Sequence, residues 1–219
     1  TVQVTLDEEG VPTYDIKQDV AWDNIPFTQR IENLAKSTKV VCFGSLAQRS
    51  EVSRTTIRKF IEAMPDDSIK ICDINLRLDY YTKAIVDKSI KMSNMLKIND
   101  EEVIKITKLF DWSGSEEEIC RRLLQEYELR ILILTKGTEG SYVFTPDLTS
   151  FLPSPRVHVA DTVGAGDSFT AAFTAAYLNG QTVEEAHCLA AEVAAYVCQQ
   201  HGAMPRLADS FVELFRDRG

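Results

Sequence analysis

Short β-rich runs alternate with longer segments of helical spacing, and this alternation restricts the fold more than any other feature of the chain. The strand-like runs are 39–44, 69–74, 95–98 and 130–135. Helical periodicity separates one run from the next. A strand that is followed by a crossover helix and another strand pairs in parallel. The pattern therefore predicts the α/β class, with a mainly parallel sheet covered by helices.

The helical segments are predicted from apolar spacing and from capping residues. Asn99 precedes three acidic residues that suit the first turn of a helix. Ser115 stands three residues before Glu118, which is the spacing of a capping box. Gly137 and Gly140 introduce a hairpin into 141–145, and an extended stretch follows over 151–159. The predicted helices are 51–64, 82–92, one that begins after Asn99, 115–128, 168–179, 183–200 and 209–216.

The first twenty residues stand outside the alternation. Val2, Val4 and Leu6 alternate with polar residues, a turn follows at 7–10, and a second run surrounds Tyr14 and Ile16. This pattern predicts a β-hairpin that forms an appended flap or a small β element. Because the sequence opens inside a strand-like run, we expect it to be incomplete.

Composition narrows the class of protein. The 219 residues include 24 Lys plus Arg against 33 Asp plus Glu, a net charge of −9. This balance disfavours nucleic acid and anionic membranes as partners and favours small molecules. The 44% of apolar residues and 26% of charged residues are typical of a globular protein. With no run of about 18 apolar residues, we expect no membrane span.

The cysteines indicate a reducing compartment. Five are present, an odd number, and none forms a C-x-x-C pair. We therefore expect a cytoplasmic location and no cysteine metal site. Cys42 and Cys72 lie inside apolar runs, where a cysteine behaves as a small hydrophobe.

The sharpest chemical feature is the string DTVGAGDSF at 161–169, which joins an extended segment to an alanine-rich helix. Gly164 and Gly166 permit close approach of another group, and the amides at a helix start can bind an anion. The string lacks the Gly-Lys-Ser/Thr ending of a P-loop, so no lysine lies in it to meet phosphates. Asp167 is placed to accept the proton of an attacking hydroxyl. The alternative is a structural glycine turn whose aspartate stabilises the helix dipole.

This string resembles the C-terminal signature of the ribokinase-like (PfkB) carbohydrate kinases, and most closely that of bacterial fructokinases. The resemblance runs through the whole sequence, and it implies that the N-terminal portion of a family member is missing. It implies a three-layer α/β/α fold with a small β lid, formed by one domain over 1–219 with residues 1–20 in the lid. It also implies that Gly164, Ala165, Gly166 and Asp167 form an anion hole, with Asp167 as catalytic base. Asp161 would then bind a monovalent cation such as K⁺.

Two further segments resemble motifs of the same family. Asn99 and Glu102 match an N-x-x-E motif that organises Mg²⁺ and phosphate through water, although alone they read as a helix cap and a first-turn acid. Thr135, Gly137 and Gly140 resemble a nucleotide-binding turn, although such glycines also make simple hairpins. Lys136 departs from the family pattern and would be placed to touch a phosphate.

Arg77 belongs to a D-x-N-x-R element that begins at Asp73 and follows a strand-like run. Its guanidinium would neutralise a transferring phosphoryl group or meet an acidic substrate. A structural Asp–Arg pair is an equal alternative. Near the C-terminus, Gly202 is a suitable left-handed helix stop, and the resemblance places nucleotide and cation contacts near His201 to Ala203.

The resemblance implies ATP-dependent phosphorylation of a sugar hydroxyl, with fructose as the leading acceptor and Mg²⁺ bridging the ATP phosphates. Asp167 and Arg77 would contact the acceptor, and the lid would cover it and form a homodimer contact. Three other acceptors stay open: ribose, 2-keto-3-deoxygluconate and a nucleoside. If the protein truly begins at Thr1, the N-terminal sugar-binding elements are missing and a nonproductive nucleotide-binding fragment is expected instead.

Overall fold

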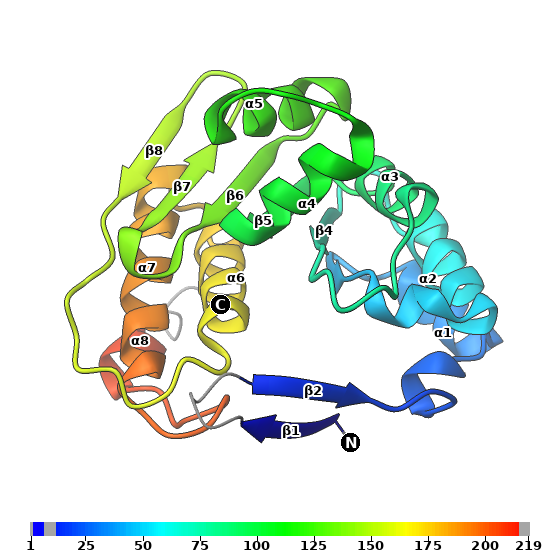
Figure 1. Ribbon diagram of the computed structural model, residues 1–219, viewed down its shortest axis with the longest axis horizontal. Helices are drawn as coiled ribbons and strands as arrows, with labels where there is room; N and C mark the ends of the chain where they lie inside the picture. The colour runs from blue at the N-terminus through cyan, green and yellow to red at the C-terminus, as the bar shows by residue number, and fades with distance from the viewer. Residues whose placement is uncertain (1, 7–11, 215–219) are drawn as a thin grey trace. The chain divides into compact units, whose positions relative to one another are not determined.

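The computed structural model of the protein describes residues 2–6 and 12–214 (Figure 1). The chain packs into two compact units, Thr1–Ser93 and Asn94–Gly219. Each unit contains alternating strands and helices, and the six strands β3 to β8 are mostly parallel. The predicted α/β class is therefore confirmed. The assignment of 1–219 to a single domain stays a prediction.

The first unit contains the predicted hairpin and one parallel strand pair. β1 (Val2–Leu6) and β2 (Pro12–Ile16) pair antiparallel in a two-stranded sheet of their own, and the turn predicted at 7–10 lies outside the described residues. β3 (Val40–Phe43) and β4 (Ile69–Asp73) pair in parallel. The helical segments of this unit are η1 (Ala21–Asp23), α1 (Gln29–Ala35), η2 (Leu46–Arg49), α2 (Glu51–Ala63) and α3 (Lys83–Lys91).

The second unit is built in three layers. β5 (Met95–Asn99) and β6 (Ile131–Thr135) pair in parallel, and β7 (Ser141–Phe144) runs antiparallel to β6 and to β8 (Thr149–Leu152). In Figure 1, α4 and α5 cover one face of these strands and α6 and α7 the other. The helices are α4 (Asp100–Phe110), α5 (Glu116–Glu126), α6 (Ala165–Leu178), α7 (Val183–Cys198) and α8 (Asp209–Glu213), and η3 (Gly137–Glu139) joins β6 to β7.

Burial explains why the central strands read as continuous apolar runs. In β5 and β6 every residue except the last is buried, as expected for strands covered on both faces. The caps also form as predicted: Asn99 and Glu102 make a capping box at α4, and Ser115 and Glu118 make one at α5. Each box satisfies amides at a helix start that have no partner within the helix.

Sequence reasoning missed one helix and misplaced one cysteine. α1 was not predicted, because it is short and polar; it begins after Thr28, whose hydroxyl accepts a bond from Ile31 N. Within the extended stretch expected over 151–159, β8 ends at Leu152, because the prolines that follow cannot donate to a strand ladder. Cys42 is exposed, whereas Cys72 is buried. Among the described residues β3 stands at an edge of the strand order, so its side chains are only partly covered.

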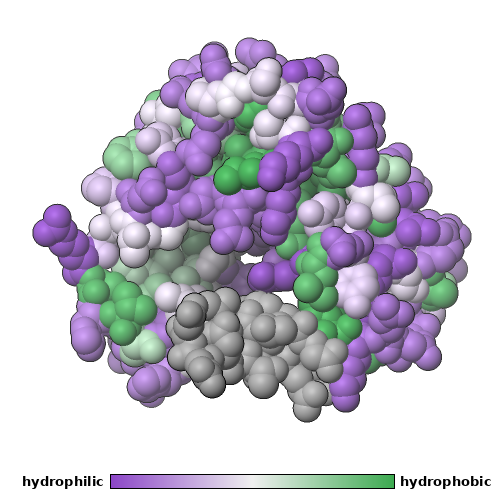
Figure 2. All heavy atoms as spheres, in the orientation of Figure 1, coloured by the Kyte–Doolittle hydropathy of each residue, from purple (hydrophilic) through white to green (hydrophobic). Residues whose placement is uncertain are grey.

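Hydrophilic side chains predominate on the face of the molecule that Figure 2 shows. Within the described residues, no helix is long and apolar enough to cross a bilayer.

A buried histidine joins the last two strands to α7. The His187 side chain is fully buried, and its two ring nitrogens contact the hydroxyls of Ser141 on β7 and Ser150 on β8 at 2.8 and 2.9 Å. Burial lowers the pKa of His187 from 6.5 to about 4. The imidazole is therefore neutral in the folded protein, with one nitrogen donating and the other accepting.

This histidine predicts acid sensitivity. Between pH 6.5 and 4 the unfolded chain binds a proton at His187 that the folded protein excludes, so stability falls as the pH falls through this window. The loss reaches up to about 3 kcal/mol at the low end. Urea unfolding at pH 7.5 and pH 5 should show a smaller pH-dependent loss in His187→Gln than in the wild type. The exposed His158→Gln is the matched control, and an equal loss in all three proteins would contradict the prediction.

Candidate functional site

The start of α6 depends on a glycine in the left-handed conformation. Gly164 has φ +82° and is the N-cap of α6, with no side chain capping the helix. A Cβ at this position would overlap the backbone of Ala203. The loop after α7 therefore lies directly against the turn that begins α6.

The Asp161 side chain bonds both to the turn at the start of α6 and to the loop after α7. Its Oδ1 accepts a bond from Val163 N at 3.0 Å, and its Oδ2 accepts one from Gly202 N at 3.1 Å. These backbone donors hold the pKa of Asp161 below its ordinary value. Gly202 has φ +84°, so the left-handed conformation expected there is confirmed. α7 ends earlier, at Cys198, so Gly202 belongs to the loop and does not stop the helix.

Two amides in the first turn of α6 are available to an anion. Ala165 N donates to Thr162 O at 3.3 Å, whereas the amides of Gly166 and Asp167 have no hydrogen-bond partner among the described residues. The Asp167 side chain is exposed and has no polar partner in the described part of the chain. The turn thus offers two donors and one carboxylate to solvent, at the positive end of a helix dipole.

Lys97 supplies a cation to this turn from a different element. It lies on β5, and its side chain is buried in a strand whose other central residues are apolar. An ideal Cβ built on Gly166 would lie 3.2 Å from Lys97 Nζ. Sequence reasoning found no lysine for the glycine turn and missed this one. The signal that could have found it is a charged residue inside an otherwise apolar strand.

The segment from Thr135 to Gly140 forms the turn that follows β6. Gly137 and Gly140 both have positive φ, +50° and +128°, and Lys136 N donates to Gly140 O at 2.9 Å. Lys136 Nζ pairs with Glu116 at 2.7 Å and with Glu139 at 3.1 Å. These carboxylates raise the pKa of Lys136. Lys136 is therefore already neutralised by acidic side chains.

A pocket of about 520 Å³ lies between this turn and the start of α6. Predicted residues from both segments line it: Thr135, Gly137, Gly140, Ala165 and Gly166. Small residues of α7 also line the pocket, and its surface is mostly apolar. Apolar walls with a few polar groups at one end are typical of small-molecule sites.

Asn99 and Glu102 lie outside the set that lines this pocket. Their side chains are engaged at α4, where Asn99 Oδ1 accepts from Glu102 N at 2.8 Å and Glu102 Oε2 accepts from Asn99 N at 2.9 Å. Their role as a helix cap is therefore present. No group of three or more His, Cys, Asp or Glu side chains in the described part of the chain is arranged to hold a metal ion.

Arg77 belongs to the first unit, and its side chain is exposed. It lies in the loop after β4, where Asn75 and Leu78 adopt positive φ of +43° and +47°. Two contacts hold this loop next to Gly44: Ser45 N donates to Ile74 O at 3.2 Å, and Ser45 Oγ donates to Asn75 O at 3.3 Å. The D-x-N-x-R element thus has a strained backbone that its neighbours keep in place.

Comparison with known proteins identifies the family. Residues 4–209 match the pfkB family carbohydrate kinases. The chain belongs to this family. It is 28% identical over 183 residues to a fructokinase of Salmonella typhimurium, covering 80% of this chain and 57% of that protein.

Solved structures agree with the fold. An uncharacterized sugar kinase from Pyrococcus horikoshii in complex with ATP superposes with a TM-score of 0.77 at 27% identity, covering 94% of this chain and 67% of that one. A fructokinase from Vibrio cholerae with bound fructose, ADP and calcium ion has a TM-score of 0.76 at 21% identity, covering 99% of this chain and 73% of that one. The second likeness supports the ribokinase-type fold alone.

The chain is shorter than these relatives. It spans 60% of the length of a curated sugar kinase of Pyrococcus horikoshii, to which it is 28% identical over 200 residues. The evidence for family membership therefore comes from the part of the relatives' length that this chain covers.

Gly164 and Gly180 form a matched pair for testing the glycine turn. Both have positive φ, +82° and +79°, but a Cβ at Gly180 meets no atom within 4 Å. Gly180→Ala should lose about 1–2 kcal/mol of unfolding free energy from backbone strain alone. Gly164→Ala should lose more, because its Cβ would also overlap the backbone of Ala203. Urea unfolding measures both losses, and equal losses in the two variants would contradict the close contact between Gly164 and Ala203.

Proposed function

We propose that this protein transfers the γ-phosphoryl group of ATP to a hydroxyl of a sugar, with fructose as the leading acceptor. The observation that carries the proposal is the uncapped start of α6, which adjoins a 520 Å³ apolar pocket and offers two amides and the Asp167 carboxylate. The pocket can enclose a nucleotide base, and the donors beside it can bind phosphate. Together they fit a nucleotide whose base lies in the pocket and whose phosphates lie at the start of α6.

In this orientation the base occupies the apolar part of the pocket, against the small side chains of α7. The turn with Thr135, Gly137 and Gly140 borders the nucleotide, and its glycines let the ligand approach the backbone. The phosphates extend to the start of α6. There the amides of Gly166 and Asp167 form the anion hole, and Gly164 and Ala165 shape the turn that holds it.

Asp167 is the proposed catalytic base and contacts the acceptor hydroxyl. Phosphoryl transfer through a loose transition state needs positioning and charge stabilisation more than early deprotonation. The carboxylate accepts the hydroxyl proton as the oxygen bonds to phosphorus, while the bond between the γ-phosphorus and the bridging oxygen breaks and ADP leaves. The amides and the Lys97 ammonium offset the negative charge of the transferred group.

The residues of the site fit Mg²⁺ that is carried by ATP. Mg²⁺ usually keeps several waters and binds phosphates with few protein ligands, and the described residues contain no acidic cluster that would form a cage. When bound, Mg²⁺ would neutralise phosphate charge. Asn99 and Glu102 would reach it through water. Asp161 with loop carbonyls is the proposed K⁺ site.

The acceptor is the least constrained part of the proposal. Fructose is favoured by the similarity to the Salmonella fructokinase, and a nucleoside kinase of Methanocaldococcus jannaschii, 29% identical over 133 residues, keeps a nucleoside open. Arg77 is the proposed acceptor contact in the first unit. The hairpin β1–β2 is the proposed lid, and a homodimer through it stays a prediction.

The first test measures ADP release with MgATP over fructose, ribose, 2-keto-3-deoxygluconate and adenosine. Asp167→Asn should lower kcat by about 10²- to 10⁴-fold with the acceptor that works best. ATP affinity should stay within about twofold, because the anion-hole amides are unchanged. Asp147→Asn, an exposed carboxylate in the turn between β7 and β8, is the control. Turnover that survives Asp167→Asn would remove the catalytic assignment, and no turnover with any acceptor would favour the nonproductive fragment.

A second test asks whether Lys97 meets the phosphates. Lys97→Met keeps the length of the buried stem but removes the charge, so it should weaken binding in proportion to phosphate charge: strongly for ATP, less for ADP and little for AMP. Calorimetric titration of the three nucleotides measures this gradient. Lys108→Met, on the exposed side of α4, should leave all three affinities unchanged. An equal loss for ATP and AMP would mean that Lys97 acts only on the fold.

A further inference from the structure

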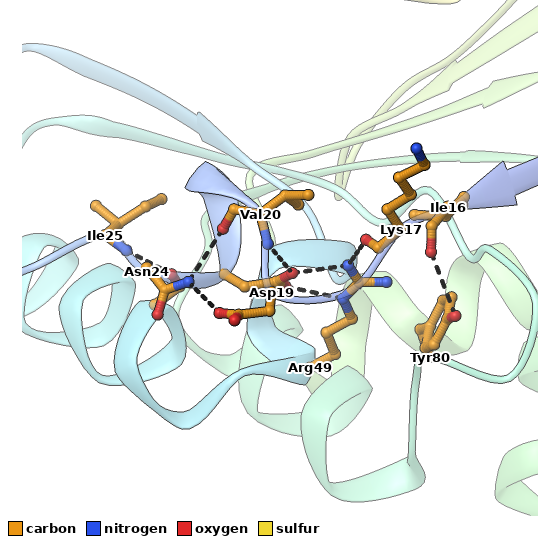
Figure 3. Close-up of polar contacts among 10 residues, drawn as sticks. Ile16, Lys17, Asp19, Val20, Asn24, Ile25, Arg49 and Tyr80 are labelled. Atoms are coloured by element: carbon orange, nitrogen blue, oxygen red, sulfur yellow. Dashed lines mark hydrogen bonds and ion pairs between the residues drawn. The ribbon is translucent and has the colours of Figure 1, made fainter. Parts of the chain in front are cut away.

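A buried arginine in the first unit binds several segments at once. The Arg49 side chain, at the end of η2, is only 9% exposed, and its partner Asp23 in η1 is 6% exposed. Arg49 donates from Nε to Asp23 Oδ1 and from Nη2 to Asp23 Oδ2, both at 2.8 Å (Figure 3). The pair is a two-bond fork, the geometry in which a guanidinium fixes direction as well as distance.

The same guanidinium reaches the end of the hairpin. Arg49 Nη2 also donates to the backbone oxygen of Lys17, the residue directly after β2, at 2.5 Å. The ring of Tyr80 lies under the guanidinium, 4.5 Å from Arg49 Cζ to the ring centroid. The Tyr80 hydroxyl donates to Ile16 O at 3.5 Å, so a side chain from η2 and one from the loop after β4 hold consecutive carbonyls where β2 ends (Figure 3).

Tyr80 connects this cluster to the loop of Arg77. Tyr80 N donates to Arg77 O at 3.2 Å, which closes the turn that contains the left-handed Leu78. A non-glycine residue in this conformation persists only where the surroundings fix it. The position of Arg49 therefore bears on the Arg77 turn through the Tyr80 ring, with no direct bond to Arg77 itself.

We propose that Arg49 is a positioning residue that holds the exit of the hairpin and the Arg77 turn in one arrangement and thereby sets acceptor affinity. This inference rests on the proposed function, in which the hairpin and Arg77 serve the acceptor. Arg49 acts through Tyr80 and the Lys17 carbonyl and does not itself touch the acceptor.

The chemistry of the pair favours positioning over stability. A buried ion pair is weak evidence for stability, because desolvation offsets the attraction of the charges. Arg49 Nη1 is buried and has no hydrogen-bond partner among the described residues, which is a further cost. What the arginine provides is a rigid fork with a flat face that stacks on an aromatic ring. A lysine has neither property.

The test compares Arg49→Lys, Arg49→Met and Tyr80→Leu with Arg30→Met, which removes an exposed charge on α1. With the best acceptor, the Arg49 and Tyr80 variants should raise the acceptor KM by about 10- to 100-fold and leave the KM for ATP within about twofold. Arg49→Lys keeps the charge but not the planar fork. An acceptor KM that stays raised in this variant would show that the fork and the stacking face, and not the charge, position the turn.

Hydrogen exchange supplies a readout that does not need turnover. In Arg49→Lys, amides of 12–24 and of 75–81 should exchange faster together, while those of β5 to β8 stay as in the wild type. Unchanged exchange at 75–81, or a lower melting temperature with both KM values unchanged, would overturn the inference. If the wild type phosphorylates no acceptor, the proposed function fails. Hydrogen exchange then still decides the coupling: Arg49 couples the two segments if both exchange faster in Arg49→Lys, and does not if only one does.

Discussion

The close approach of Gly164 to Ala203 is the constraint on which the candidate site depends. No other residue fits there, because a side chain would meet backbone and because φ is positive. The contact places the loop after α7 beside the start of α6, and Asp161 bonds both segments. The helix consequently begins without a side-chain cap, and its first amides stay open to a ligand. A serine or aspartate cap would satisfy those donors and close the site.

Two loops of the protein solve the same physical problem in different ways. At the start of α6, Gly164 supplies the left-handed conformation at little cost. In the loop after β4, Asn75 and Leu78 adopt it with side chains, at a cost that the surroundings must offset. Ser45 fixes one end of that loop and Tyr80 the other. Loops that carry function are commonly held in this manner by a rigid scaffold.

Local patterns were predictable from the sequence, and contacts between distant residues were not. The buried strands, the capping boxes and the glycine turn follow from periodicity and from residue type. The bond from Gly202 to Asp161 joins residues forty-one positions apart, and Lys97 meets Gly166 from another layer. No local rule encodes such pairs. The exposure of Cys42 was missed for the same reason, since an apolar run does not reveal whether its strand lies at an edge.

The source of positive charge follows from this architecture. A P-loop carries its lysine within the loop, so cation and amides move together. Here the amides belong to α6 and the ammonium to β5, and burial holds Lys97 against Gly166. Phosphate affinity would then depend on how α6 packs on the sheet and not on the loop alone. A small residue at position 166 is accordingly required by the lysine, because a Cβ there would lie 3.2 Å from Lys97 Nζ.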